Sequence, residues 1–171
     1  MKADETGAPD VSEHGGDLGG TLLALGSRLH RIQEEILGSL DPPLTLRQYR
    51  ILSRVRAGHT SLTALCKLAH RNPSTMSEGV DKLVKMGLLT RGTVEENRRT
   101  MRLGLTDAGL IAQQTGRRAL EKFTGELTAG IPAELHDLLL PTLITLYHDS
   151  QRNLDERATD KEGDDNSQSP Q

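Results

Sequence analysis

The stretch that most constrains the fold of this 171-residue chain covers residues 72–106. Asn72 is a favourable helix N-cap and Pro73 suits the first helical position, so the pair predicts the start of a helix. Apolar residues recur at helical spacing through 73–86, and Gly87 can end the helix in a left-handed conformation. The stretch therefore begins with a short amphipathic helix that has a defined start and end.

Two short apolar runs follow this helix. Residues 88–90 and 101–105 have the composition of strands, and the polar segment 95–99 separates them. Two such runs around a polar tip predict a β-hairpin directly after the helix.

Two further helices are expected before residue 72. Thr45 is followed three residues later by Gln48, a capping-box pattern, and Gly58 ends the apolar periodicity that follows. Ser61 or Thr60 can cap a third, short helix, whose inward residues would be Leu62, Leu65, Cys66 and Ala69. Helix, turn and second helix followed by a hairpin predict a winged helix-turn-helix over about residues 43–106.

Longer helices are expected on both sides of this unit. Residues 18–40 carry one apolar stripe, formed by Leu18, Leu22, Leu25, Leu29, Ile32 and Ile36. A helix is expected from 106 to about 129, and its larger apolar residues are Leu110, Ile111, Leu120, Phe123 and Leu127. Pro132 begins a last, leucine-rich helix to about residue 154, which Pro141 should kink or break.

The flanking helices carry more leucine than a small winged domain can cover, which predicts that they form a dimer interface. The alternative is that they pack only within one chain. The predicted fold is mainly α with a small β-hairpin wing, in which dimerisation helices 18–40 and 106–154 flank the winged helix-turn-helix. This single domain would cover residues 18–154. The acidic tails 1–17 and 155–171, each with a net charge of −4, are expected to be disordered.

The charge of the chain is unevenly distributed. Residues 43–106 contain 12 Lys or Arg against 4 Asp or Glu, a local charge of +8 in a chain whose net charge is −3. A basic segment inside an acidic protein is the expected electrostatic footprint of a polyanionic partner such as double-stranded DNA. A solvated surface of mixed charge is the alternative explanation.

Several classes of protein are disfavoured by the sequence. It has no 18-residue apolar run for a membrane span and no secretion signal. We therefore expect a cytoplasmic protein with no membrane partner. Its one cysteine, Cys66, should be a buried and inert thiol. The six histidines lack the spacing of a zinc site, and hydrolase and P-loop signatures are absent. No enzymatic activity, metal or cofactor is therefore predicted.

The segment NRRTMRLGLTDAG, residues 97–109, resembles the wing signature of the MarR family of winged-helix transcription regulators. Its matching positions are Arg98, Arg99, Leu105, Thr106 and Gly109. Upstream, the runs PSTMS (73–77), VDKL (80–83) and MGL (86–88) are similar to the recognition helix of the family. The resemblance covers about residues 18–154 and implies a homodimer whose first and last two helices form the interface.

The resemblance also implies roles in DNA binding. Arg99 would enter the minor groove, while Arg98, Arg91 and Arg71 are better suited to phosphates. The recognition helix would bring Ser74, Thr75, Ser77 and Lys82 near the major groove. For any single cation here, a solubilising surface role is the alternative.

Four positions depart from the family pattern. Glu78 stands at the centre of the exposed helix face, where many members have Arg, and a carboxylate there repels phosphate and could read only a cytosine amino group. Gly79 weakens the helix by about 1 kcal/mol relative to Ala. Arg71 replaces a small apolar residue, and Asn97 replaces the usual Asp, which predicts a more mobile wing.

The functional hypothesis is a sequence-specific transcriptional regulator, a ligand-responsive repressor that binds a pseudo-palindromic operator as a homodimer. A small aromatic or anionic effector would bind between the dimer helices and the winged domain, near His30, Tyr49 and Arg50. Core packing is the alternative for Tyr49, and solvent exposure for the other two. The rival hypothesis is a protein-interaction module that has lost sequence-specific DNA binding, which Glu78 and the acidic tails favour.

Overall fold

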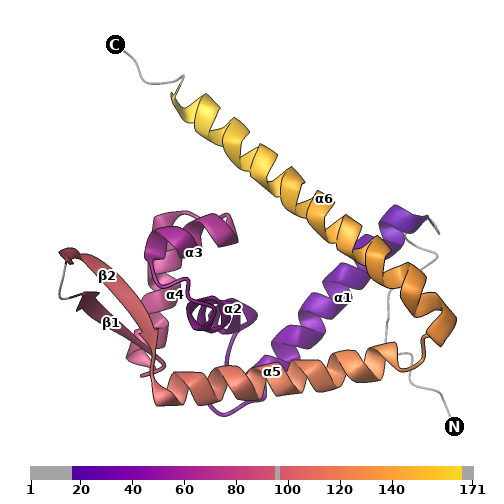
Figure 1. The fold of residues 1–171 in the computed structure, drawn as a ribbon, viewed down its shortest axis with the longest axis horizontal. Helices are drawn as coiled ribbons and strands as arrows, with labels where there is room; N and C mark the ends of the chain where they lie inside the picture. Colours follow the sequence, from indigo (N-terminus) through magenta and orange to yellow (C-terminus); the bar gives the residue numbers. More distant parts are fainter. Residues whose placement is uncertain (1–16, 95–96, 167–171) are drawn as a thin grey trace, which may run out of the picture.

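The elements form in the predicted order. The computed structural model describes residues 17–94 and 97–166, with side chains placed for 17–92 and 102–157. Within these ranges the elements are α1 (Leu18–Gly38), α2 (Leu46–Arg56), α3 (Leu62–Ala69), α4 (Pro73–Lys85), β1 (Leu89–Val94), β2 (Asn97–Leu105), α5 (Asp107–Thr128) and α6 (Ala133–Asn166). In Figure 1 the hairpin and α2–α4 lie at one end of α5, and α1, α5 and α6 meet at the other. The predicted disorder of residues 1–16 lies outside the described residues.

The predicted helix caps of the winged unit are present. Thr45 and Gln48 bond each other's backbone N–H groups at 3.2 and 2.8 Å, which completes the capping box of α2. Ser61, not Thr60, caps α3, and Asn72 caps α4 by accepting from the Thr75 N–H at 2.8 Å. Local sequence therefore defines where these three helices begin.

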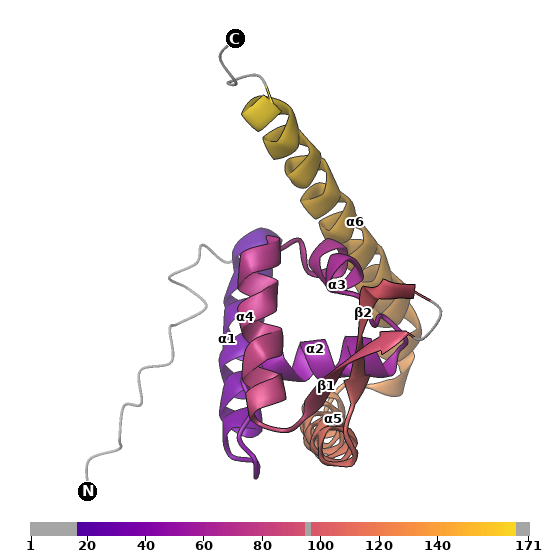
Figure 2. The same ribbon diagram turned by 90° about the vertical axis from the view of Figure 1, so that its left-hand side faces the viewer.

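The core lies between α2, α3, α4 and the base of the hairpin. Its buried residues are Leu37, Leu44, Leu46, Ile51, Leu52, Val55, Leu65, Met76, Val80, Leu83, Leu88, Leu89, Leu103 and Ala112. In α4 the inward residues are those predicted from helical spacing, with Met76, Val80 and Leu83 buried. The face of α4 that turns outward is therefore also the predicted one (Figure 2).

The wing is an antiparallel pair with Leu89 opposite Leu105. A backbone bond from the Leu103 N–H to the Thr60 carbonyl, 2.8 Å long, ties β2 to the loop before α3. Both strands are longer than predicted, and β2 begins at Asn97. Residues 97–99 were expected in the polar tip, and that boundary was wrong because backbone pairing between the two strands continues past the apolar positions.

Helix α5 packs against its own chain through small and polar residues. Its buried residues are Gly109, Ala112, Gln113 and Gly116. Of its larger apolar residues, Leu110, Ile111 and Leu127 are exposed, while Leu120 and Phe123 are only partly buried. The buried residues are small because α5 lies close to α2 and α1. A Cβ at Gly116 would stand 3.0 Å from the Tyr49 ring and 3.1 Å from Leu37.

The last helix also differs from the prediction. It continues through Pro141 without a break and extends to Asn166, twelve residues beyond the expected end at 154. Proline removes one backbone hydrogen bond, and on an exposed helix water can satisfy the freed carbonyl. Residues 155–162 contain no glycine or proline, so nothing in the local sequence stops the helix where charge increases.

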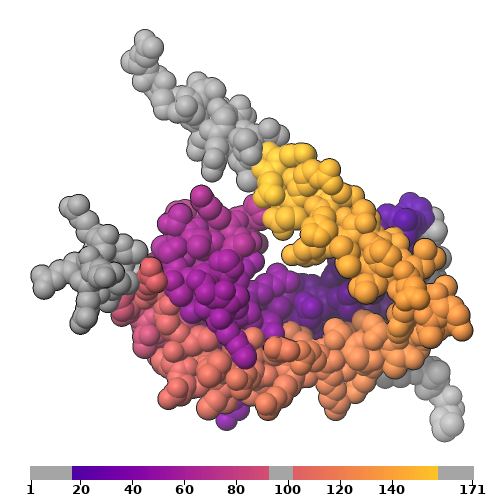
Figure 3. Space-filling view, in the orientation of Figure 1, coloured from indigo at the N-terminus to yellow at the C-terminus, as the bar shows by residue number. Residues whose placement is uncertain are grey.

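Large apolar side chains remain uncovered on α1 and α6. Leu18, Leu23 and Leu25 of α1 are exposed, as are most of the leucines of α6. In the stripe predicted on α1, Leu18 and Leu25 are exposed and the other four residues are half-buried, whereas the fully buried residue of α1 is Leu37. Figure 3 shows an opening between α6 and the body formed by α1 and α2.

Gly109 provides a test of how α5 joins the wing. A Cβ at this position would lie 1.9 Å from the Leu88 carbonyl oxygen. We expect Gly109→Ala to lower the free energy of unfolding by about 3 kcal/mol, as overpacking against backbone does. The measurement is urea unfolding at a fixed protein concentration.

Gly125→Ala on the same helix is the control, because nothing lies within 4 Å of the added Cβ. It should stabilise the protein by up to about 1 kcal/mol through helix propensity. Equal unfolding midpoints for the two variants would contradict the close approach of α5 to Leu88.

Candidate nucleic-acid interface and the adjoining cavity

Gly79 sets the position of α4 against α2. A Cβ at Gly79 would stand 2.9 Å from Cδ1 of Ile51 and 3.8 Å from Cδ of Arg47. The residue that weakens α4 as a helix is therefore the one that lets the two helices approach closely. This close packing explains why a glycine stands at position 79, where the sequence alone showed only its low helix propensity.

The outward face of α4 is polar. Ser74, Glu78 and Lys82 are exposed, whereas Thr75 and Ser77 are half-buried at its margins. The exposed residues belong to one helix face because they are spaced by four. Glu78 lies between the other two on that face, so its carboxylate meets whatever docks there.

Arg91 of β1 forms an ion pair with α4. Its Nη2 atom lies 2.7 Å from Oδ1 of Asp81 on α4, and the Ser77 hydroxyl donates to the other carboxylate oxygen at 3.5 Å. The pair joins the base of the wing to the recognition helix. Arg98 and Arg99 lie in β2, on the continuation of the same hairpin, and their side chains are outside the described part of the chain.

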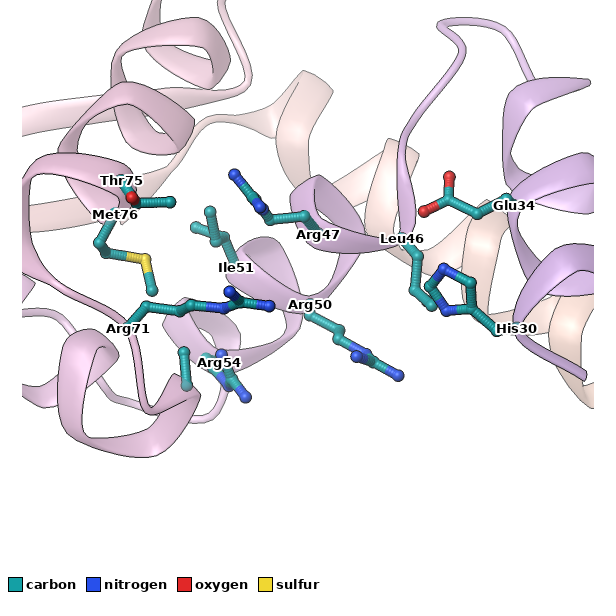
Figure 4. Close-up of a pocket in the computed structure, with 11 residues that line it drawn as sticks. His30, Glu34, Leu46, Arg47, Arg50, Ile51, Arg54, Arg71, Thr75 and Met76 are labelled. Carbon is teal, nitrogen blue, oxygen red and sulfur yellow. The ribbon is translucent and has the colours of Figure 1, made fainter. Parts of the chain in front are cut away.

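A cavity of about 340 Å³ adjoins the N-terminal end of α4. Its lining is rich in arginine, with Arg47, Arg50 and Arg54 from α2 and Arg71 from the turn before α4. His30 and Glu34 of α1 lie across from them, as Figure 4 shows. Four guanidinium groups face one carboxylate in this cavity, so it favours an anion.

The electrostatics of Arg54 reflect this crowding. Burial lowers its pKa, and the nearby positive charge of Arg50 lowers it further. One Nη2 atom of Arg54 donates to the Leu68 carbonyl at 3.1 Å. The arginines lie close together with too few carboxylates to balance their charge. A bound anion would reduce the repulsion between them.

The three predicted effector residues do not share one site. His30 and Arg50 line the cavity, but Tyr49 points to the other side of α2 and packs against α5 at Gly116. The alternative of core packing therefore holds for Tyr49. Arg47 and Arg54 were missed, although the spacing of residues 47, 50 and 54 places them on one helix face.

Two of the predicted DNA-binding residues also line the cavity. Arg71 and Thr75 form part of its wall, at the turn before α4 and in the first turn of that helix. The end of the recognition helix and the cavity are thus built from some of the same side chains.

Other chemistry finds little support in the described residues. Cys66 is half-buried and burial raises the pKa of its thiol, as expected for an inert cysteine. The ranges 17–94 and 97–166 contain no group of three His, Cys, Asp or Glu that could hold a metal ion. No helix in those ranges is long and apolar enough to cross a membrane.

The sequence and the fold were compared with those of known proteins. The model of the MarR family matches residues 44–101, from the start of α2 to β2. The match covers the winged helix-turn-helix unit, about a third of the chain. The predicted fold class, a winged helix-turn-helix with flanking helices, is confirmed. Regulators of the MarR family are not enzymes and are typically dimeric.

Solved structures of MarR proteins share the fold at low identity. The reduced form of MarR from E. coli is 22% identical, with a TM-score of 0.64 over 76% of this chain and 96% of that chain. A MarR-family regulator from Rhodococcus sp. RHA1 is 18% identical, with a TM-score of 0.63 over 81% and 97%. The S. aureus MepR–DNA complex is 15% identical, with a TM-score of 0.64 over 78% and 96%. No curated protein matches the sequence at a significant level.

The Asp81–Arg91 pair generates a prediction about DNA binding. Asp81→Asn removes a negative charge beside the recognition helix and frees Arg91 to meet phosphate. We expect tighter binding to duplex DNA of unrelated sequence, with a salt dependence of log K steeper by about one. Fluorescence anisotropy over a range of salt concentrations measures both.

Glu121→Gln is the matched control, because Glu121 on α5 also holds an arginine, Arg117, at 2.6 Å but lies away from α4. Its DNA binding should equal that of the unmodified protein. An Asp81→Asn variant with the same salt slope as this control would show that Arg91 does not meet phosphate.

Proposed function

We propose that this protein is a ligand-responsive repressor of the MarR family, which acts in the cytoplasm and binds a pseudo-palindromic operator as a homodimer. The observation that carries the proposal is the polar outward face of α4, which is capped by Asn72 and adjoins a hairpin bearing Arg91, Arg98 and Arg99. Such a helix can enter the major groove while the wing reaches the neighbouring minor groove.

The proposed DNA contacts divide into two kinds. Ser74, Thr75, Ser77, Glu78 and Lys82 would face base edges or the adjoining backbone from α4. The wing arginines and Arg71 would contact phosphates, with Arg99 in the minor groove. A structure with the same fold, S. aureus MepR, is a complex with DNA, which supports duplex DNA as the partner.

The proposed homodimer draws support from the uncovered leucines. Exposed apolar side chains lie on α1, α5 and α6. These three helices meet at the end of the molecule remote from α4 (Figure 1). Burying these side chains against a second copy would remove a large apolar area from water. A two-fold axis there would separate the recognition helices so that half-sites lie one helical turn apart, about 34–36 Å.

The arginine-lined cavity is the proposed effector site. Four guanidinium groups and no Phe, Tyr or Trp ring line it, which favours the anionic over the aromatic character of the effector. His30 and Arg50 would contact the ligand, together with Arg47 and Arg54. An effector bound there must prefer the form of the protein that does not bind DNA in order to release the operator.

Operator binding is tested by selecting genomic fragments and titrating the winning fragment with salt. We expect one inverted repeat to be selected, with affinity that falls steeply as salt rises. Arg99→Ala should weaken binding to every operator variant about tenfold, because it removes a sequence-tolerant contact. Lys82→Ala and Glu78→Ala should change affinity unevenly among operator variants.

Arg118→Ala supplies the control, since Arg118 is exposed on α5 and outside the proposed interface. Unchanged affinity in Arg99→Ala would remove the wing from the site. Flat, weak binding to all fragments would instead favour the second candidate function, a protein-interaction module, which the exposed carboxylate of Glu78 supports.

Effector chemistry is tested by thermal unfolding with two probes at constant ionic strength. Succinate, a non-aromatic dianion, should raise the Tm more than benzoate, an aromatic monoanion, because the cavity has several cations and no aromatic side chain other than His30. Arg50→Gln should abolish the difference, whereas Arg118→Gln should not. A larger shift with benzoate would mean that an aromatic ring, not charge, is recognised.

A further inference from the structure

The C-terminal half of α6 contacts the turn between α3 and α4. Among the side chains of residues 132–157, nearly all are exposed, and only Asp149 and Gln151 are half-buried. The side-chain amide nitrogen of Gln151 lies 2.6 Å from Nε2 of His70. Oδ1 of Asp155, one turn further along α6, lies 3.4 Å from the same ring atom.

His70 stands at the turn that aims α4. It is the C-cap of α3 and adopts a left-handed conformation, with φ of 47°. Backbone bonds from His70 to Lys67 and from Arg71 to Cys66, both 3.2 Å, hold this turn closed. Asn72, the N-cap of α4, follows two residues later, so a shift of the turn shifts the first turn of the recognition helix.

The contact belongs to one continuous face of α6. Tyr147, Gln151 and Asp155 are spaced by four residues and therefore lie above one another along the helix. Tyr147 is close enough to Arg54 to oppose part of the lowering of its pKa. The same face thus lies on the side of Arg54 of α2 and contacts the turn before α4, although the rest of α6 is exposed.

We propose that Gln151 is a positioning residue, which through His70 holds the α3–α4 turn at a set place relative to α6. This inference rests on the proposed function, in which α6 belongs to the dimer interface. Because α6 also begins beside α1 and α5, the contact ties the dimerisation end of each chain to its recognition helix (Figure 1). As a consequence of this contact, the dimer binds operators over a narrower range of half-site spacings.

The test compares full-length dimers on inverted repeats of the selected half-site whose spacing is cognate or altered by one and two base pairs. Gln151→Ala should reduce the preference for the cognate spacing about fivefold, the worth of one net hydrogen bond. Its Tm should not change, because Gln151 lies on a helix with few contacts. Gln151→Glu should retain the preference, because its carboxylate can accept the N–H that His70 presents at Nε2 in its other tautomer.

Asn153→Ala is the control on the same helix, where the amide only donates to the Asp149 carbonyl at 2.9 Å. An equal loss of affinity at every spacing in Gln151→Ala, or no loss of preference, would overturn the inference. Hydrogen exchange at residues 66–76 gives a second readout without DNA, since Gln151→Ala should speed exchange there and Asn153→Ala should not. If the unmodified protein selects no repeat, the proposed repressor function fails, and unchanged exchange would separately overturn the α6 contact.

Discussion

The hydroxyl group of Thr106 holds together the point where wing, recognition helix and long helix meet. It donates to the Gly87 carbonyl at 2.7 Å and accepts from the Gly109 N–H at 2.9 Å. The Thr106 N–H bonds the Leu88 carbonyl at 3.2 Å. Gly87 follows α4, and Gly109 lies in the first turn of α5. The Thr106 side chain therefore fixes the start of α5 against the end of α4. The spacing of Leu105, Thr106 and Gly109 in the sequence thereby acquires a physical reason.

Helix α2 connects the remaining parts through its two sides. On one side Gln113 of α5, buried and bonded through both ends of its amide, links Arg56 and Ser53 of α2. On the other side Arg47, Arg50 and Arg54 face the cavity. A ligand in the cavity and a movement of α5 would therefore act on the same helix. The cavity also borders α4 directly, through Thr75 and Met76.

The winged unit could be predicted well because its signals are local. Caps, glycine stops and helical spacing act over a few residues, and Thr45, Asn72 and Thr106 cap their helices as expected. The predicted residues of α4 also lie on its outward face or at its margins. The hairpin strands were placed correctly but too short, because strand pairing depends on the partner strand as well as on local composition.

In the long helices the local sequence pattern left the packing undetermined. Periodicity predicted α5, but it could not tell that Gly109 and Gly116 would face the neighbouring elements. Proline chemistry suggested a break at Pro141, whereas an exposed helix tolerates the lost bond. The common surroundings of Arg47, Arg50, Arg54 and Arg71 were equally hidden, since they come from two segments of the chain.

The sequence by itself determined the fold class, the order of the elements, the ends of the short helices and the basic character of the winged unit. These properties depend on short-range hydrogen bonding and on charge, which can be read along the chain. Only the tertiary structure decided which face of α5 is buried, that Asp81 holds Arg91, that four arginines enclose one cavity and that α6 reaches His70. Each of these depends on the distance between residues far apart in the sequence, and packing alone sets that distance.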